Sequence, residues 1–245
     1  MDGPKAYSSQ HNDAENSLSV QERLAFLESR FASTSSTATY VPHSLRIANP
    51  GPLGLFAFAY TTALLSTTYT KWADGGTTDY AIAYGLFYGG LAQLLAGMWA
   101  IWARNTFAGT AFSSFGSFWL GYGTHGILVA AGVLKGMEPE GEQTLLALWA
   151  ILAFILFLQT FNINIVLVVL FLFLVLQLAL MAAGPQHPRA VKAGGYFGQG
   201  AASMAFYAGL AELTNEVYRR TIFPLGILNL VTAQQKSNDQ RPDTL

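Results

Sequence analysis

The chain has 245 residues, of which 52% are hydrophobic and 11% are charged, and its formal net charge is −1. Soluble domains contain about 25% charged residues, so this composition argues against an ordinary soluble fold. A near-neutral charge also argues against nucleic acid as a partner. The sequence contains no cysteine, which excludes disulfides and a thiolate metal site.

The first 48 residues are polar and lack the charged-then-apolar pattern of a signal peptide. Ser19 and Glu22 form a capping-box pattern, after which apolar residues recur at helical spacing. These apolar residues are Val20, Leu24, Leu27 and Phe31. We therefore predict a cytosolic tail over 1–48 with an amphipathic helix at 19–31. Such a helix lies on the membrane or on its own domain, or makes a coiled-coil contact; its shortness favours the first interpretation.

Five long runs without charge follow this tail. Asp, Glu, Lys and Arg are absent from 52–70, 81–103, 105–134, 143–186 and 193–211. About 20 apolar residues cross the hydrocarbon core of a bilayer. The fourth run is roughly twice that length and is interrupted by Asn162 and Asn164, so we predict two spans within it. The pattern predicts an all-α membrane protein, with a bundle of six transmembrane helices in a transport domain at 49–226 and a polar tail at 227–245.

A proline-interrupted stretch leads into the first span. Pro50 and Pro52 cannot both lie inside a helix, although Pro52 suits the first turn of a new one. Asn49 can turn its side chain onto the amides of that turn. Simple helix termination is one interpretation. The other, which we favour, is an anion site, because broken helix starts in membranes survive where they face water and carry positive partial charge.

Three further motifs occur in order along the chain. The second span contains Phe87-Tyr88-Gly89-Gly90-Leu91-Ala92-Gln93-Leu94-Leu95-Ala96-Gly97, whose small residues let helix backbones approach closely. The third span contains Asn105-Thr106-Phe107 and the run from Thr110 to Trp119, and the C-terminal region contains Glu212-Leu213-Thr214-Asn215-Glu216 and Pro224-Leu225-Gly226. Together with the stretch from Asn49 to Leu55, these motifs resemble the acetate uptake transporter family over residues 48–226. That family includes the bacterial succinate–acetate permease and fungal acetate and ammonia-export proteins.

The resemblance implies a six-span protomer with its own pathway, assembled as a homo-hexamer in the lipid bilayer with both termini in the cytosol. It also implies a narrow hydrophobic constriction formed by Phe58, Phe115 and Leu174. The middle position is usually Tyr in the family, so Phe115 lacks a hydroxyl that could bond a carboxylate. Without the resemblance, these three residues would be interpreted as packing residues.

A carboxylate buried in hydrocarbon without partners costs tens of kcal/mol in the Born limit, so a route for an acid must supply hydrogen-bond donors. The candidate substrate-binding residues are Asn49, Pro50, Pro52, Leu53 and Gly54 at the entrance, and Thr61, Thr62, Gln93, Ser114 and Asn215 elsewhere. Gln93 can equally form an interhelical hydrogen bond. His125 and Glu212 are the proton-linked candidates. The alternatives are a structural histidine and an ion pair between Glu212 and Arg219 or Arg220.

The leading hypothesis is transport of acetate and similar small monocarboxylates, with succinate as a further substrate, by proton symport or channel-like conduction. The alternatives are an ammonia or ammonium pathway and a non-conducting oligomeric membrane scaffold or sensor. The sequence contains neither a His-Glu-x-x-His motif nor a phosphate loop, so we expect no enzyme, metal site or cofactor. We expect a multi-pass protein of the plasma membrane or an organellar membrane.

Overall fold

The computed structural model describes residues 22, 24–25, 47–184 and 187–228, and the chain divides into a unit at 1–47 and a unit at 48–245. The helix predicted at 19–31 lies outside the described residues except for Glu22, Leu24 and Ala25, which are helical and exposed. The predicted tail at 227–245 likewise lies outside them beyond residue 228. The remaining description concerns the second unit.

Helices account for the described part of the second unit, apart from its connections and one isolated bridge between Asn164 and Ile227. They are α3 (Gly51–Thr70), α4 (Gly76–Tyr84), η2 (Gly85–Ala92), α5 (Gln93–Trp102), α6 (Thr106–Ala130), α7 (Pro139–Thr160), α8 (Ile165–Ala182) and α9 (Pro188–Tyr218). The α4, η2 and α5 segments form one continuous rod, since the residues at their junctions keep helical dihedral angles. The predicted all-α class is therefore confirmed for the described residues.

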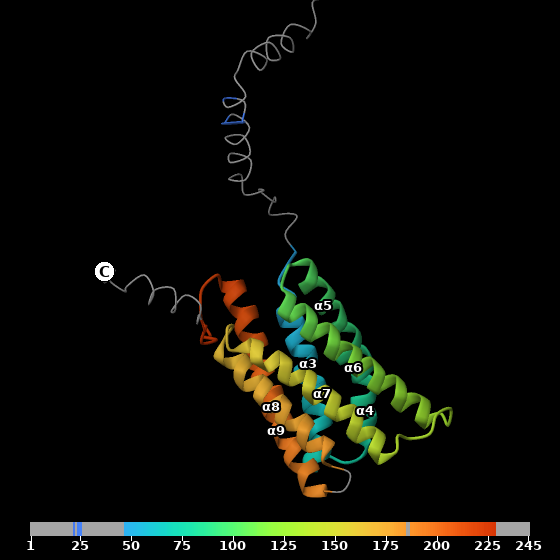
Figure 1. The fold of residues 1–245 in the computed structure, drawn as a ribbon. Coiled ribbons are helices and arrows are strands. Elements are labelled where there is room, and N and C mark those ends of the chain that lie inside the picture. Colours follow the sequence, from blue (N-terminus) through green and yellow to red (C-terminus); the bar gives the residue numbers. More distant parts are fainter. Residues whose placement is uncertain (1–21, 23, 26–46, 185–186, 229–245) are drawn as a thin grey trace, which may run out of the picture. The chain divides into compact units, whose positions relative to one another are not determined.

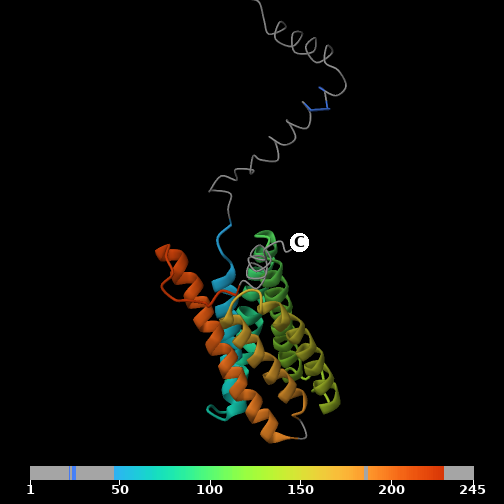
Figure 2. The same ribbon diagram turned by 60° about the vertical axis from the view of Figure 1, so that its left-hand side comes forward.

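The helices pack side by side as a bundle (Figures 1 and 2). The α3 helix packs against α9, which contacts α8, and α8 contacts α7. On the other side, α3 contacts η2, and η2 and α5 pack against α6. Buried side chains of α3, α6 and α8 form much of the central apolar cluster, which includes Phe58, Phe115 and Leu174. These three helices therefore supply the interior of the bundle.

Small residues let the rod containing η2 approach its neighbours closely, as the sequence predicts. A Cβ atom at Gly89 would lie 2.9 Å from the Thr61 Cβ on α3, and one at Gly90 would lie 2.9 Å from Leu120 on α6. The π-helical winding of this segment was not predicted. Short π segments occur often at functional sites, and this one ends directly before Gln93.

The C-terminal segment returns to the start of α8. The Ile165 N–H donates to the Gly226 carbonyl at 2.9 Å, and the Leu228 N–H donates to the Ile163 carbonyl at 3.0 Å. The Asn215 side chain holds the intervening turn, because its Oδ1 accepts from the Ile222 and Phe223 amides at 2.7 and 3.0 Å. This segment therefore fixes the end of α9 beside the beginning of α8.

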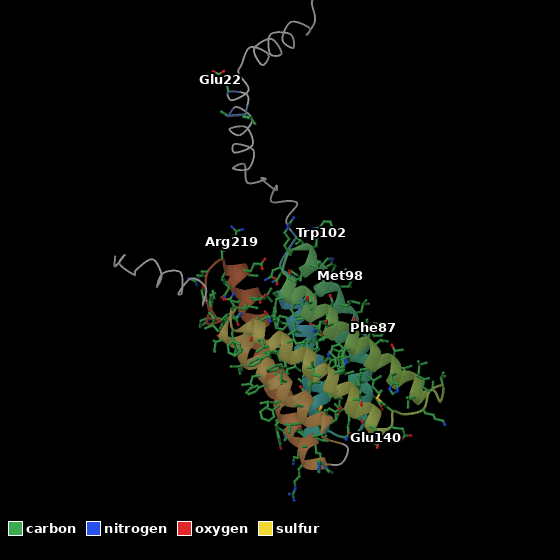
Figure 3. The ribbon with its side chains drawn as sticks, viewed as in Figure 1. Glu22, Phe87, Met98, Trp102, Glu140 and Arg219 are labelled. Atoms are coloured by element: carbon green, nitrogen blue, oxygen red, sulfur yellow. The ribbon has the colours of Figure 1, made fainter. Side chains whose placement is uncertain are left out.

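The outer surface of the bundle is largely apolar. Phe87, Met98 and Trp102, labelled in Figure 3, are 67%, 53% and 79% exposed. Three helical stretches are long and apolar enough to cross a membrane, namely Gly76–Trp102, Pro139–Thr160 and Ile165–Ala182. Exposed apolar side chains of this kind suit contact with lipid or with further protein.

Candidate functional site

Three helix starts meet at one cavity of about 130 Å³. The cavity is lined by Asn49 before α3, Asn105 before α6 and Asn164 before α8. Asn49 and Asn105 are exposed, whereas Asn164 is buried, so the three amides extend from the solvent into the bundle. We call this cavity, with its lining residues, the vestibule.

Each asparagine is held by the helix that it precedes. Asn105 Oδ1 accepts from the Ala108 N–H at 3.0 Å, and Asn164 Oδ1 accepts from the Leu167 N–H at 2.9 Å, which are ordinary N-cap bonds. Asn49 lies one residue further out, since Pro50 occupies the cap position. Its Oδ1 still accepts from the Gly51 N–H at 2.8 Å, as the sequence predicts for the amides of that turn.

The electrostatics of the vestibule favour an anion. Each helix start carries a partial positive charge of roughly half an elementary unit, and three starts lie around the same space. The vestibule is also lined by one carboxylate, that of Glu212, whose Oε2 accepts from Asn49 Nδ2 at 3.0 Å. Glu212 therefore contacts Asn49 rather than forming the ion pair with Arg219 or Arg220 considered from the sequence. A Cβ at Gly51 would overlap this carboxylate, so only glycine fits there without displacement.

A narrow apolar region separates the vestibule from a second cavity of about 650 Å³, which we call the inner chamber. Phe58, Phe115 and Leu174 line both cavities and are only 6%, 5% and 4% exposed. The rings of Phe58 and Phe115 meet edge to face, with centroids 5.9 Å apart. We call these three residues the neck.

The neck residues lie at matching depths on the three central helices. Phe58 follows Asn49 by nine residues, whereas Phe115 and Leu174 each follow their asparagine by ten. At 1.5 Å per residue, the neck is about 15 Å along the helices from the asparagines, which is about half the thickness of a hydrocarbon core. This repeated spacing brings together three side chains that are far apart in the sequence.

Polar side chains occur on the far side of the neck as well. Thr62 and Gln177 line the inner chamber, and their Oγ1 and Oε1 atoms are buried with no hydrogen-bond partner among the described residues. His125 and Glu142 also line this chamber. The predicted proton-linked candidates therefore lie in different cavities, with Glu212 in the vestibule and His125 in the inner chamber.

The predicted substrate-binding residues divide into three groups, of which one is Thr62 in the inner chamber. Asn49, Pro50 and Gln93 line the vestibule, and Gln93 is 1% exposed with its Oε1 unpartnered among the described residues. The others do not line either cavity and are Pro52, Leu53, Gly54, Thr61, Ser114 and Asn215. Thr61 donates to the Ala57 carbonyl at 2.8 Å, and Asn215 is occupied by the C-terminal turn.

Sequence reasoning missed three residues of these cavities. Asn105 was noted only within a motif and Asn164 only as a break between spans, although each precedes an apolar helix just as Asn49 does. Gln177, in the second span of the run 143–186, was not singled out. The sequence feature that could have identified Gln177 is that it is the one polar side chain between Ile165 and Ala182. A polar residue within a membrane helix is costly and therefore indicates a buried or functional position.

Apolar outer helices around two cavities that share an apolar neck are typical of an integral membrane protein. Residues 31–228 match the GPR1/FUN34/yaaH family, and the chain belongs to that family. The family resemblance predicted from the sequence motifs is thus confirmed.

Relatives and a solved structure agree with this assignment. The chain is 37% identical over 193 residues to acetate permease A of Emericella nidulans, covering 71% of this chain and 65% of the relative, just under two thirds of its length. It is 34% identical over 185 residues to the succinate-acetate/proton symporter SatP of Escherichia coli K12, covering 74% of this chain and 96% of that protein. The structure of the bacterial acetate channel SatP matches with a TM-score of 0.70 and 33% identity, over 74% of this chain and all of the other.

Proposed function

We propose that the protein conducts acetate and related small monocarboxylates across a membrane through the vestibule, neck and inner chamber. The observation that carries this proposal is that three side chains line both cavities, directly below three convergent helix starts. The names of the relatives, acetate permease and succinate-acetate/proton symporter, support the choice of solute. Succinate would be a larger substrate of the same route.

The vestibule would recognise the carboxylate. Three helix N-termini attract negative charge, and the Asn49, Asn105 and Gln93 amides supply N–H donors. The Glu212 carboxylate already occupies the Asn49 amide, so an incoming acid would compete with it for that donor. Glu212 is accordingly the proton-linked candidate at the entrance, because its protonation would weaken this competition.

The neck would set the size of the solute. Phe58, Phe115 and Leu174 offer no hydrogen bonds, which suits a methyl group and excludes bulk water and hydrated ions. Phe115 also contacts the Trp149 and Phe171 rings, at centroid distances of 5.6 and 6.5 Å. Such packing on several sides restricts how far the ring can move aside, so we expect a sharp limit on solute width.

We further propose that α3, the α4–η2–α5 rod and the four later helices form six spans, with both ends of the unit in the cytosol. An even number of spans returns the chain to the side on which it began. The exposed apolar side chains of the rod and of α7 offer surfaces for association into a homo-hexamer. The plasma membrane and an organellar membrane are both compatible with this topology.

Uptake of labelled acetate into proteoliposomes tests the proposal. We expect saturable flux above that of empty vesicles, with acetate faster than butyrate. Replacing Leu174 with alanine should raise the rate for butyrate relative to acetate, because it removes a bulky side chain from the neck. Absence of saturable acetate flux in the wild-type protein, or an unchanged butyrate-to-acetate ratio in the variant, would refute this mechanism.

An ammonia pathway is the second candidate, and it is supported by one relative. The chain is 51% identical over 79 residues to ammonia transport outward protein 2 of Saccharomyces cerevisiae, covering 32% of this chain and 28% of that protein. A neutral molecule such as ammonia could pass an apolar neck. Measuring ammonia flux in the same vesicles distinguishes the two, because ammonia conduction alone would leave acetate uptake at the background level. No flux of either solute would favour the oligomeric scaffold.

A further inference from the structure

The inner chamber contains a group of buried polar side chains that no role described above explains. Thr62 and Ser66 lie one helical turn apart on α3, and Gln177 lies on α8. They are 2%, 0% and 6% exposed, and Thr62 Oγ1, Ser66 Oγ and Gln177 Oε1 have no hydrogen-bond partner among the described residues. A buried polar atom left unpaired costs about 1–3 kcal/mol. Two of these atoms belong to residues that line the inner chamber, Thr62 and Gln177, and they indicate a place that takes a hydrogen-bonding guest.

Gly198 on α9 brings these groups together. A Cβ added at Gly198 would overlap Ser66 Oγ and would lie 2.7 Å from Gln177 Nε2. Ser66 and Gln177 therefore pack together against the backbone of this glycine, while Thr62 and Gln177 line the inner chamber. We call these three residues, with Gly198, the polar notch.

The chemistry of the polar notch suits a neutral carboxyl group rather than a carboxylate. An amide presents an acceptor and donors side by side, and a carboxylic acid presents the complementary O–H donor and carbonyl acceptor. Hydroxyl groups can fill either role. The notch itself contains no cation and no helix start, so an ionised carboxylate placed there would be desolvated without compensation. The vestibule, in contrast, has three helix starts and favours the anion.

Charged and titratable groups around the notch do not change this preference. The inner chamber is lined by Tyr69 from α3, by Tyr122 and His125 from α6 and by Glu142 from α7. On α9, the nearest charged residues along the sequence are Lys192, six positions before Gly198, and Glu212, fourteen positions after it. The α8 helix has no charged residue. The α8 helix therefore supplies no positively charged side chain that could stabilise a carboxylate in the notch.

We propose that the polar notch is a binding subsite for the undissociated carboxylic acid, with Gln177 as the residue that pairs with its carboxyl group. This inference rests on the proposed function, because the acid reaches the notch through the neck. The carboxylate would take its proton from hydronium in the solution that reaches the vestibule, pass the neck as the acid, and return the proton to water on the other side. Proton movement with the substrate would then need no titrating side chain beyond the neck.

Acetamide is a suitable probe, since it has the shape of acetic acid, carries no charge and offers a donor beside an acceptor. In proteoliposomes we expect acetamide to inhibit wild-type acetate flux competitively. Replacing Gln177 with leucine should weaken this inhibition about tenfold and raise the KM for acetate about tenfold, with little change in kcat, because an amide pair is lost. Ser66→Ala should give a smaller change in the same direction and perturbs the packing little.

Two matched controls separate binding from packing. Gly198→Ala would push the Gln177 amide aside and should act like Gln177→Leu, whereas a Cβ at Gly136, which lines neither cavity, meets no atom within 4 Å and should leave both values unchanged. Gln159→Leu removes an exposed amide of α7 that bonds only to its own helix, and it should also have no effect. Failure of acetamide to inhibit the wild type, or equal effects of Gln177→Leu and Gln159→Leu, would overturn the proposal.

A binding measurement keeps this inference separate from the proposed function. If the wild-type protein shows no acetate flux, acetamide-dependent thermal stabilisation of the purified protein still reports on the notch. Stabilisation that disappears in Gln177→Leu and persists in Gln159→Leu would support the subsite even then. Stabilisation that is absent from the wild type would refute it. A melting temperature that shifts in Gln177→Leu by the same amount with and without acetamide would indicate a purely structural role.

Discussion

Replacing Asn49 with aspartate tests whether the entrance recognises negative charge. The variant keeps an oxygen that can accept from the Gly51 N–H, now 2.8 Å from the asparagine Oδ1, but it loses the donor to Glu212. It also places a second carboxylate within about 4 Å of the first. Two like charges at that distance repel by about 1 kcal/mol in water and by about 4 kcal/mol at the effective dielectric constant of a protein surface.

An acetate ion entering the vestibule would meet the same added charge. Because Asn49 is exposed, we take the lower part of that range, about 1–2 kcal/mol, which corresponds to a KM for acetate raised roughly fivefold to thirtyfold. The assay is initial acetate uptake into proteoliposomes at neutral pH over a series of acetate concentrations. The kcat should change less than the KM, because the perturbation lies before the neck.

Asn162→Asp is the matched control. Asn162 is exposed, precedes the vestibule residue Asn164 by two positions and does not line the vestibule. This variant adds the same charge to the same end of the bundle and should change the KM less than twofold. An unchanged KM in Asn49→Asp, or an equal rise in both variants, would refute the reasoning, since the effect would then be absent or would follow net charge alone.

Three further predictions concern residues near the two cavities. Gly51→Ala should change the acetate KM severalfold, because its Cβ would push the Glu212 carboxylate away from Asn49, whereas Gly75→Ala, with no atom within 4 Å, should leave the KM unchanged in the same uptake assay; equal values for the two variants would contradict this contact. Thr61→Val should leave the acetate KM within about twofold of wild type, since its hydroxyl bonds to its own helix; a tenfold rise would instead place Thr61 in the path. Asn215→Ala should destabilise the protein by about 1–3 kcal/mol by freeing the C-terminal turn, while the KM of the remaining folded protein stays constant in kinetic measurements; an unchanged melting temperature would contradict this structural role.

The helices were largely predictable because charge is expensive in a bilayer and is therefore confined to the ends of spans. The interruption at Asn162 and Asn164 correctly divides one long apolar run into α7 and α8. The π winding of η2 could not be predicted, since Gly85 and Gly89 are equally compatible with an ordinary close helix contact.

The site was predictable only in part. The position of Asn49 at an interrupted helix start could be predicted locally, because two prolines follow it in the sequence. Asn105 and Asn164 could be recognised from the sequence only as ordinary N-cap residues. That they line the same cavity depends on tertiary packing, which the sequence pattern does not give. Thr61 and Asn215 are polar residues that satisfy the backbone instead of lining a cavity, and such local bonding cannot be recognised from residue type alone.

The contact between Glu212 and Asn49 joins the last helix of the unit to its first turn, and α3 packs along α9. Asn49 is synthesised long before Glu212. The α3 helix therefore enters the bilayer before α9, the helix along which it packs, has been made. The vestibule is consequently completed only once α9 has been made, and a protein truncated before α9 would insert its early helices without a complete vestibule.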